Sequence, residues 1–179
     1  MAVVQGDITH RYTEPNGPGD TNAGAAATSL GGFAATNEPT SGASQNAYGH
    51  LVLADNSGGA VHYRAFFVAN TDGADTWYAV KVWIASQSSN GADHAIALDG
   101  VGVVDLDSAS AQGETEADED TAPTGETFTS PTSKDTGINV GDVGPGQGFT
   151  VWVRRTGTGS PALSGAFVAI RWEGQDAAP

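Results

Sequence analysis

The acidic residues in the middle of the chain are the first candidates for chemistry in this sequence of 179 residues. Residues 114–120 read ETEADED, which places five acids in seven positions, and Asp105 and Asp107 precede them. Carboxylate oxygens are the ligands that Ca²⁺ takes, but a calcium loop counted from Asp105 fails, because Ala109 and Ser110 stand where it needs a ligand and a glycine. We therefore predict a solvated charge run. The alternative is an irregular Ca²⁺ site built from Asp105, Asp107, Glu114 and Glu116.

The sequence carries no other pattern typical of a catalytic centre. It has no cysteine, which excludes a cysteine nucleophile, a disulfide framework and a thiolate zinc site. Its four histidines have no short metal-ligand spacing, and we expect His62 to be a hydrogen-bonded or exposed residue of a strand. No Gly-x-Ser-x-Gly motif is present, and the glycine-rich residues 143–148 lack the Lys-Ser/Thr of a phosphate loop. We predict that the protein is not an enzyme and uses no cofactor.

The four tryptophans are the remaining candidates for a binding site. Aromatic rings stack on the apolar faces of sugars, so a cluster of exposed tryptophans would indicate a carbohydrate-binding module. The interpretation that we favour is that these rings pack between sheets or between subunits. The residues concerned are Trp77, Trp83, Trp152 and Trp172.

The net charge excludes two classes of partner. Twenty-one acidic residues against seven basic residues give a net charge of −14. Nucleic acids and anionic membrane surfaces both require a basic face, so we expect neither to bind. No apolar run approaches the roughly 18 residues of a membrane span, and the first residues lack the basic and apolar regions of a secretory signal. We expect a soluble protein that is made in a cytoplasm.

Short apolar segments that alternate with a period of two predict an all-β protein. They are rich in β-branched and aromatic residues and end at Gly, Asn, Asp or Pro, which is typical of strands. About seven strands with one apolar face fit a β-sandwich better than a single sheet. The expected strands are residues 30–35, 50–54, 61–70, 77–86, 93–98, 101–106, 149–155 and 166–173.

Two long stretches fall outside this pattern. Residues 1–29 are interrupted by proline and glycine and predict an extended N-terminal arm, which leaves residues 30–179 as the sandwich domain. Residues 107–148 contain the acidic run and predict a long surface loop with its acids in water. Between two long strands, residues 71–76 predict either a hairpin or an arch that joins two sheets.

Aromatic residues stand on both faces of several predicted strands, so we expect something to cover the outer face. The arm, another copy of the chain or a different protein would provide this cover. Apolar residues of the arm and outward aromatic side chains are therefore the candidates for interface contacts. They are Val3, Val4, Ile8 and Tyr12 of the arm, and Phe66, Trp83 and Trp152 of the strands.

Several stretches of the sequence resemble small virion proteins of tailed bacteriophages. Residues 68–84 (VANTDGADTWYAVKVWI) are similar to a strand, arch and strand of these proteins. The stretch TAPTGETFTSPTSK at 121–134, then GDVGPGQ at 141–147 and VWVRRT at 151–156, is similar as well. Near its end the chain carries Arg-Trp-Glu-Gly at 171–174, where the family tends to carry Arg-x-Glu-Gly. The likeness covers most of the predicted sandwich domain.

The resemblance implies an immunoglobulin-like antiparallel β-sandwich with a non-enzymatic, structural role in a phage particle. The expected place is the outside of the head, where a decoration or cement protein binds the major capsid protein and stabilises contacts between its subunits. Self-association, for example as a trimer at a lattice threefold axis, fits that role. Two alternatives stay open: a tail, neck or fibre-associated virion protein, and a carbohydrate-binding adhesive module.

Overall fold

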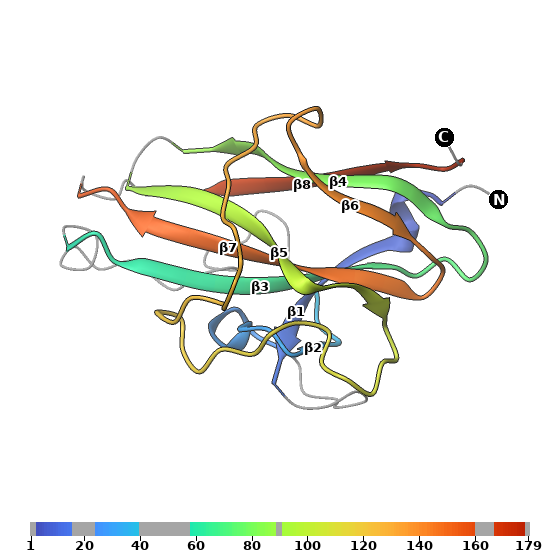
Figure 1. Ribbon diagram of the computed structural model, residues 1–179, viewed down its shortest axis with the longest axis horizontal. Helices are drawn as coiled ribbons and strands as arrows, with labels where there is room; N and C mark the ends of the chain where they lie inside the picture. The colour runs from blue at the N-terminus through green and yellow to red at the C-terminus, as the bar shows by residue number, and fades with distance from the viewer. Residues whose placement is uncertain (1–2, 16–23, 40–57, 89–90, 160–166, 178–179) are drawn as a thin grey trace.

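The computed structural model describes residues 3–15, 24–39, 58–88, 91–159 and 167–177. In these residues the protein is nearly all β, and two antiparallel sheets pack against each other (Figure 1). The predicted β-sandwich is thereby confirmed. No helix in the described part of the chain is long and apolar enough to cross a membrane.

Eight strands and two short 3-10 helices make up the described structure. They are η1 (Gln5–Asp7), β1 (Ile8–Glu14), η2 (Ala26–Thr28), β2 (Phe33–Ala34), β3 (Val61–Asn70), β4 (Trp77–Gln87), β5 (Ala92–Asp105), β6 (Ile138–Val143), β7 (Gln147–Gly157) and β8 (Val168–Gln175). β3 has the predicted bounds, whereas the strands predicted at 93–98 and 101–106 are one strand, β5, with an irregularity after Leu98. The strand predicted at residues 50–54 lies outside the described residues.

The two sheets are joined by an arch. The larger sheet has five strands in the order β2-β1-β3-β7-β5, and the smaller has three in the order β6-β4-β8. Residues 71–76 lead from β3 in the larger sheet to β4 in the smaller one, so the arch, one of the two predicted geometries, is confirmed. Asn70 is fully buried at the start of this arch, and its amide nitrogen donates to the carbonyl oxygens of Asp75, Val143 and Gly144 over 2.9–3.2 Å. These bonds satisfy backbone groups where the chain leaves one sheet for the other.

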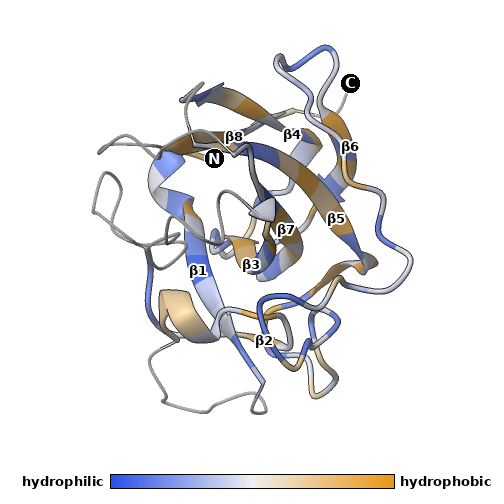
Figure 2. Ribbon diagram, turned by 90° about the vertical axis from the view of Figure 1, so that its left-hand side faces the viewer, coloured by the Kyte–Doolittle hydropathy of each residue, from blue (hydrophilic) through white to orange (hydrophobic). Residues whose placement is uncertain are grey.

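The space between the sheets holds the apolar core. Inward-facing residues of β4, such as Val82, pack with those of β7, such as Phe149 and Val151. All three side chains are at most 2% exposed. Figure 2 shows hydrophobic segments on β4, β5, β7 and β8, whereas β1 is mainly hydrophilic. Burying each large apolar side chain stabilises the fold by about 1.5–3 kcal/mol relative to leaving it exposed.

The prediction of a separate arm at residues 1–29 is wrong for its middle part. β1 pairs antiparallel with β3, so that Tyr12 stands opposite Phe66. This pairing covers an edge of β3 whose backbone groups would otherwise lack partners. The sequence of β1, ITHRYTE, contains only Ile8 and Tyr12 as large apolar residues, so its hydropathy gives no strand signal.

An irregular layer covers the outer face of the larger sheet (Figure 1). This covering layer consists of residues 24–35, which include the short strand β2, and residues 106–128, and it packs on Trp152, which is fully buried. The predicted loop bounds of 107–148 are wrong at their end, because residues 138–148 already belong to β6, the turn after it and the start of β7. The acidic segment is therefore part of a packed layer and not an excursion into solvent.

Residues 129–137, which we call the strap, lead from the covering layer across the outer edge of β5 to the smaller sheet (Figure 1). Thr129 forms a two-bond bridge with Ile96 of β5, with N···O distances of 2.8 and 2.9 Å. Two residues later, the Pro131 carbonyl accepts a hydrogen bond from the Ile84 N–H of β4 at 2.9 Å. β6 pairs with β4 only as far as Val82, so the strap occupies the edge that β6 leaves open.

Candidate functional site

The covering layer is the strongest candidate for a functional surface, because it carries the acidic run and is fixed by buried hydrogen bonds. Asp99 of β5, which is 4% exposed, is its main anchor. One carboxylate oxygen of Asp99 accepts hydrogen bonds from the Trp152 indole N–H and the Glu114 backbone N–H, both at 2.8 Å. The other oxygen accepts the Val101 N–H at 3.0 Å. A buried carboxylate with three donors fixes the start of the acidic run over the sheet.

Gln112 fastens the covering layer at a second point. Its side chain donates to the carbonyl oxygens of Asp105 and Leu106, at 2.9 and 2.6 Å, and accepts the Ala34 N–H at 2.6 Å. The Gln112 carbonyl accepts the Thr150 hydroxyl at 2.8 Å. One residue, 1% exposed, thereby links the end of β5, the 24–35 segment and β7.

Gly31 joins the two halves of the covering layer. It forms an antiparallel bridge with Thr115, and its φ is +87°. A Cβ added at this position would lie 1.6 Å from the carbonyl oxygen of Glu114. Both the positive φ and the close approach of the two backbones require glycine here.

The acids of the run form the rim of the covering layer. Burial, followed by the neighbouring charges of Glu114 and Asp118, raises the pKa of Glu116. The Thr121 hydroxyl donates to Asp118 at 2.7 Å and lowers the pKa of that carboxyl. Among the described residues, no ion pair involves Glu116 or Asp118. The rim therefore carries negative charge that the described part of the chain does not pair.

A groove of about 470 Å³ lies beside η2, between the two halves of the covering layer. Arg64 lines it, but its guanidinium is ion-paired with Glu119 and donates to the Tyr63 carbonyl at 2.8 Å. Most of the remaining lining is apolar or acidic. It comes from Pro15, Ala27, Thr28, Leu30, Thr115, Glu116, Ala117, Asp118 and Glu119.

A row of basic side chains lies at one end of the larger sheet. Arg155 of β7 stands opposite His62 of β3 and opposite His94 of β5, and all three are at most 9% exposed. The Arg155 guanidinium donates to Nδ1 of His62 at 2.6 Å. Burial, and then the charge of Arg155, lowers the pKa of His94 to about 4, so this ring is neutral at pH 7.

His62, Glu119 and Asp120 form the one group in the described chain whose possible ligand atoms lie within 4.8 Å of one another. Their hydrogen bonds do not suit a metal ion. Because Arg155 donates to Nδ1 of His62, the ring proton belongs on Nε2, which faces Asp120 at 3.3 Å. A metal at Nε2 would move that proton to Nδ1, against the Arg155 donor, and Glu119 is already paired with Arg64. His62 is thus the hydrogen-bonded strand residue that the sequence predicts.

The irregular Ca²⁺ site is not assembled. Within the described chain, its four predicted ligands form no group of three carboxylates close enough to hold one ion. Glu114 instead accepts the Thr124 backbone N–H at 2.7 Å. The carboxylates that the alternative required are Asp105, Asp107, Glu114 and Glu116.

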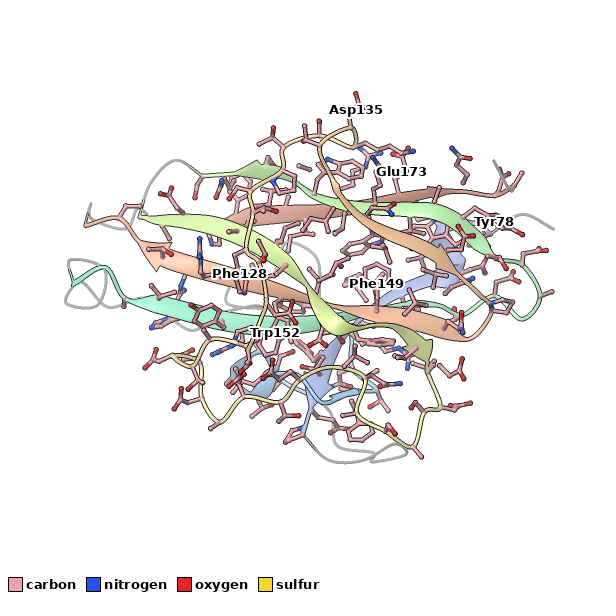
Figure 3. The ribbon with its side chains drawn as sticks, in the orientation of Figure 1. Tyr78, Phe128, Asp135, Phe149, Trp152 and Glu173 are labelled. Atoms are coloured by element: carbon pink, nitrogen blue, oxygen red, sulfur yellow. The ribbon has the colours of Figure 1, made fainter. Side chains whose placement is uncertain are left out.

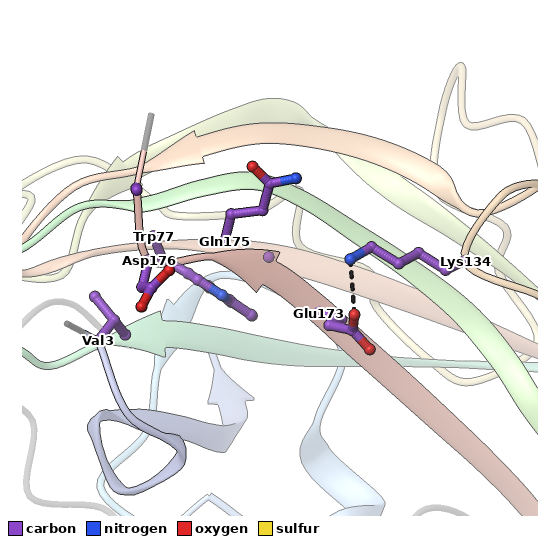
Figure 4. A pocket seen from close by; sticks show the side chains of 8 residues that line it. Val3, Trp77, Lys134, Glu173, Gln175 and Asp176 are labelled. Carbon is purple, nitrogen blue, oxygen red and sulfur yellow. Dashed lines mark hydrogen bonds and ion pairs between the residues drawn. The ribbon is translucent and has the colours of Figure 1, made fainter. Parts of the chain in front are cut away.

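A second hollow, of about 530 Å³, lies where the end of β8 meets the N-terminal residues (Figure 4). Trp77 forms part of its wall and is 7% exposed. Gly174 leaves room for the indole, since a Cβ there would lie 2.5 Å from Trp77 Nε1. Lys134 of the strap donates to Glu173 at 2.7 Å at the margin of this hollow and lowers the pKa of Glu173.

The tryptophans predicted as interface anchors are buried. Trp152 and Trp83 are 0% and 6% exposed. Figure 3 shows Trp152 on the side of the larger sheet that faces the covering layer, and Phe149 on the side that faces the smaller sheet. Trp83 stands opposite Arg171 of β8, whose guanidinium carbon lies 5.7 Å from the ring centroid. Neither ring is available to a partner or to a sugar, which corrects both interface predictions.

Of the five other predicted interface residues, four pack against other residues of the same chain. Val3, Ile8 and Phe66 are partly buried against the core. Tyr12 packs on Phe66, with ring centroids 6.1 Å apart. Val4 is exposed, at 59%, and is the one member of the set that offers a free apolar side chain.

The residues that fix the covering layer to the sheet could not be predicted from the sequence. Asp99 and Gln112 belong to no motif, and Asp99 meets Glu114 and Trp152 across 15 and 53 positions of the chain. The one available signal is that Asp99 ends an alternating apolar segment with a charge.

No protein-family model, no curated protein and no solved structure matches this chain. Function therefore has to be inferred from the surface itself. That surface offers an acidic rim, an apolar groove beside η2 and a few exposed apolar side chains.

Proposed function

We propose that this protein is a non-enzymatic structural component of a tailed-phage particle, a decoration or cement protein on the outside of the head. The observation that carries the proposal is the covering layer, an acidic surface held on a β-sandwich by Asp99 and Gln112. The likeness of residues 68–84 and 121–134 to small virion proteins supports the same role. The immunoglobulin-like form of the sandwich stays a prediction from that likeness.

A cement protein acts by adding contacts between neighbouring subunits. A preformed surface suits this task, because ordering a loop at the moment of binding costs conformational entropy. The net charge of −14 makes a basic surface the complementary partner, and such complementarity speeds association. The proposed partner is the major capsid protein, and the proposed location is the exterior of the virion.

Self-association is a further part of the proposal. A closed arrangement such as a trimer at a lattice threefold axis would combine many weak contacts into high avidity. Among the described residues, three large apolar side chains are exposed and are candidates for contacts between copies. They are Val4, Phe167 and Val101, at 59%, 52% and 47% exposure.

Two other functions would use the same fold. A tail, neck or fibre-associated protein would share the sandwich but occur in few copies. A carbohydrate-binding module has less support, because Trp77, Trp83 and Trp152, three of the four tryptophans that could stack on a sugar, are at most 7% exposed. A sugar would have to enter the hollow beside Trp77.

The number of copies per particle tests the proposal. Quantitative mass spectrometry of purified particles, with the major capsid protein as the internal reference, gives this number directly. We expect a ratio to the capsid subunit near one or a simple fraction of it. A handful to a few dozen copies would assign the chain to the tail or neck, and its absence would overturn the virion role and favour the adhesive module.

A further inference from the structure

The groove beside η2 combines apolar walls with acidic side chains, and this combination defines what fits it. We propose that it receives a lysine or arginine side chain from the surface of a partner protein. A groove of about 470 Å³ accommodates one long side chain, and the covering layer that forms it is held in place by Asp99 and Gln112.

The walls suit the aliphatic part of such a side chain. Lysine and arginine carry a long apolar stem that packs on apolar surface while the charged end stays near water or a carboxylate. Pro15, Ala27, Leu30 and Ala117 provide that apolar surface. An acidic side chain would be repelled by the rim, and an apolar one would leave the acids of the groove without a partner.

The charges suit the cationic end. Glu116 and Asp118 line the groove and take part in no ion pair of the described residues. Glu116 shares a hydrogen bond with Glu114, and burial together with the neighbouring negative charges raises its pKa. A cation beside Glu116 would relieve this repulsion and favour the ionised carboxylate. Glu119 contributes less, because it is paired with Arg64.

A second copy of the chain is a poor source of this cation. The chain has seven lysine and arginine residues, and all of them are described. Only Arg171 is exposed, and its guanidinium already contacts Glu173 at 3.5 Å and lies 5.7 Å from the Trp83 ring centroid. The other six are buried or half-buried. The basic side chain therefore comes from a different protein, and taking the major capsid protein as that partner rests on the proposed function.

An NMR titration of the full chain tests the groove. The cationic probes are Nα-acetyl-lysine methylamide and Nα-acetyl-arginine methylamide, and Nα-acetyl-norleucine methylamide keeps the lysine stem without its ammonium group. We expect the cationic probes to shift the amide resonances of residues 27–30 and 115–119, and to do so less at high salt. The norleucine probe should bind about fivefold more weakly or not at all.

Variants that lack the acidic charges test whether the cationic probes bind in the groove. Glu116→Gln with Asp118→Asn removes both charges but keeps a side-chain oxygen that can accept from Thr121. Asp107→Asn with Asp135→Asn is the matched control, because both carboxylates are exposed and neither lines the groove (Figure 3 labels Asp135). We expect the groove pair to weaken cationic-probe binding about fivefold and the control pair to change it by less than about twofold. Urea unfolding of both double variants verifies that the fold is intact.

Three results would overturn the inference: no shifts at residues 27–30 and 115–119, equal binding of the norleucine probe, or an equal loss in the control pair. Its failure is separable from that of the proposed function. If the groove binds the cationic probes while the chain is missing from particles, the virion role fails and the groove inference stands. If the chain coats particles but the probes do not bind, the groove inference alone fails.

Discussion

The two faces of the larger sheet are buried in different ways. The inner face packs Phe149 and Val151 against aliphatic side chains of the smaller sheet. The outer face places Trp152 under a layer of irregular chain that Asp99 and Gln112 hold in place. Apolar contact between two sheets is non-directional, whereas attachment of the covering layer depends on individual donors and acceptors.

This difference shows what an irregular segment needs in order to cover a sheet. Irregular backbone brings N–H and C=O groups that require partners once they are buried. Asp99 supplies an acceptor for the Glu114 N–H, and the Thr13 hydroxyl accepts the Gly31 N–H at 2.9 Å. The inner face should therefore respond mainly to lost volume, and the outer face to the loss of single polar atoms.

Truncation of the inner face has the largest expected effect. Phe149→Ala removes a side chain that is 1% exposed and leaves a cavity between the sheets. We expect the free energy of unfolding to fall by about 3–5 kcal/mol. Urea unfolding followed by circular dichroism measures this value, and a loss below about 1 kcal/mol would contradict a closely packed inner face.

Lowering the pH tests the polar end of the inner face, where His94 lies. Burial and Arg155 lower the pKa of His94 to about 4, against 6.5 for an unperturbed ring, so the folded state prefers the neutral form. This contribution to stability is fully present above pH 6.5 and is lost as the pH falls toward 4. The shift corresponds to about 3 kcal/mol between pH 7 and pH 4.

His94→Gln separates this effect from that of the carboxylates. Glutamine does not titrate, and the substitution leaves every acidic residue of the chain in place. Urea unfolding at pH 7 and pH 4 should show that the variant loses about 3 kcal/mol less than the parent. The same pH dependence in both proteins would show that His94 is not held neutral by its surroundings.

The smallest expected effect belongs to the outer face, and it is local. Trp152→Phe keeps most of the buried ring but removes the indole N–H that donates to Asp99. We expect a loss of about 1–3 kcal/mol in the free energy of unfolding. Hydrogen exchange should become faster at the Glu114 amide, which binds the same Asp99 oxygen, while β3 and β4 keep their protection. An equal loss of protection on both faces would remove the distinction between them.

Strands with long apolar alternation can be predicted from this sequence. β3 and β4 follow from a side-chain period of two, because each strand must bury one face, whereas for residues 71–76 the sequence leaves a hairpin and an arch open. β1 lacks that signal, since ITHRYTE is mostly polar and its strand conformation comes from pairing with the edge of β3.

The covering layer could not be predicted from the sequence, for a different reason. Aromatic residues on both faces of β7 indicate that something covers the outer face, but they do not indicate which segment does so. The contacts that decide this, such as Asp99 with Trp152 and Glu116 N–H with the Leu30 carbonyl, join residues that are far apart in the chain. The carboxylates of the acidic run are half-exposed or exposed, as the sequence predicts, whereas its backbone is part of the covering layer.

The strap bears on how the chain behaves when it is concentrated. β5 is an outermost strand of its sheet, and an open outermost strand offers its backbone to any copy that collides with it, which is how fibres are seeded. Thr129 already occupies both backbone groups of Ile96 on that side. We therefore expect the strap to hinder pairing of a second copy along this part of β5.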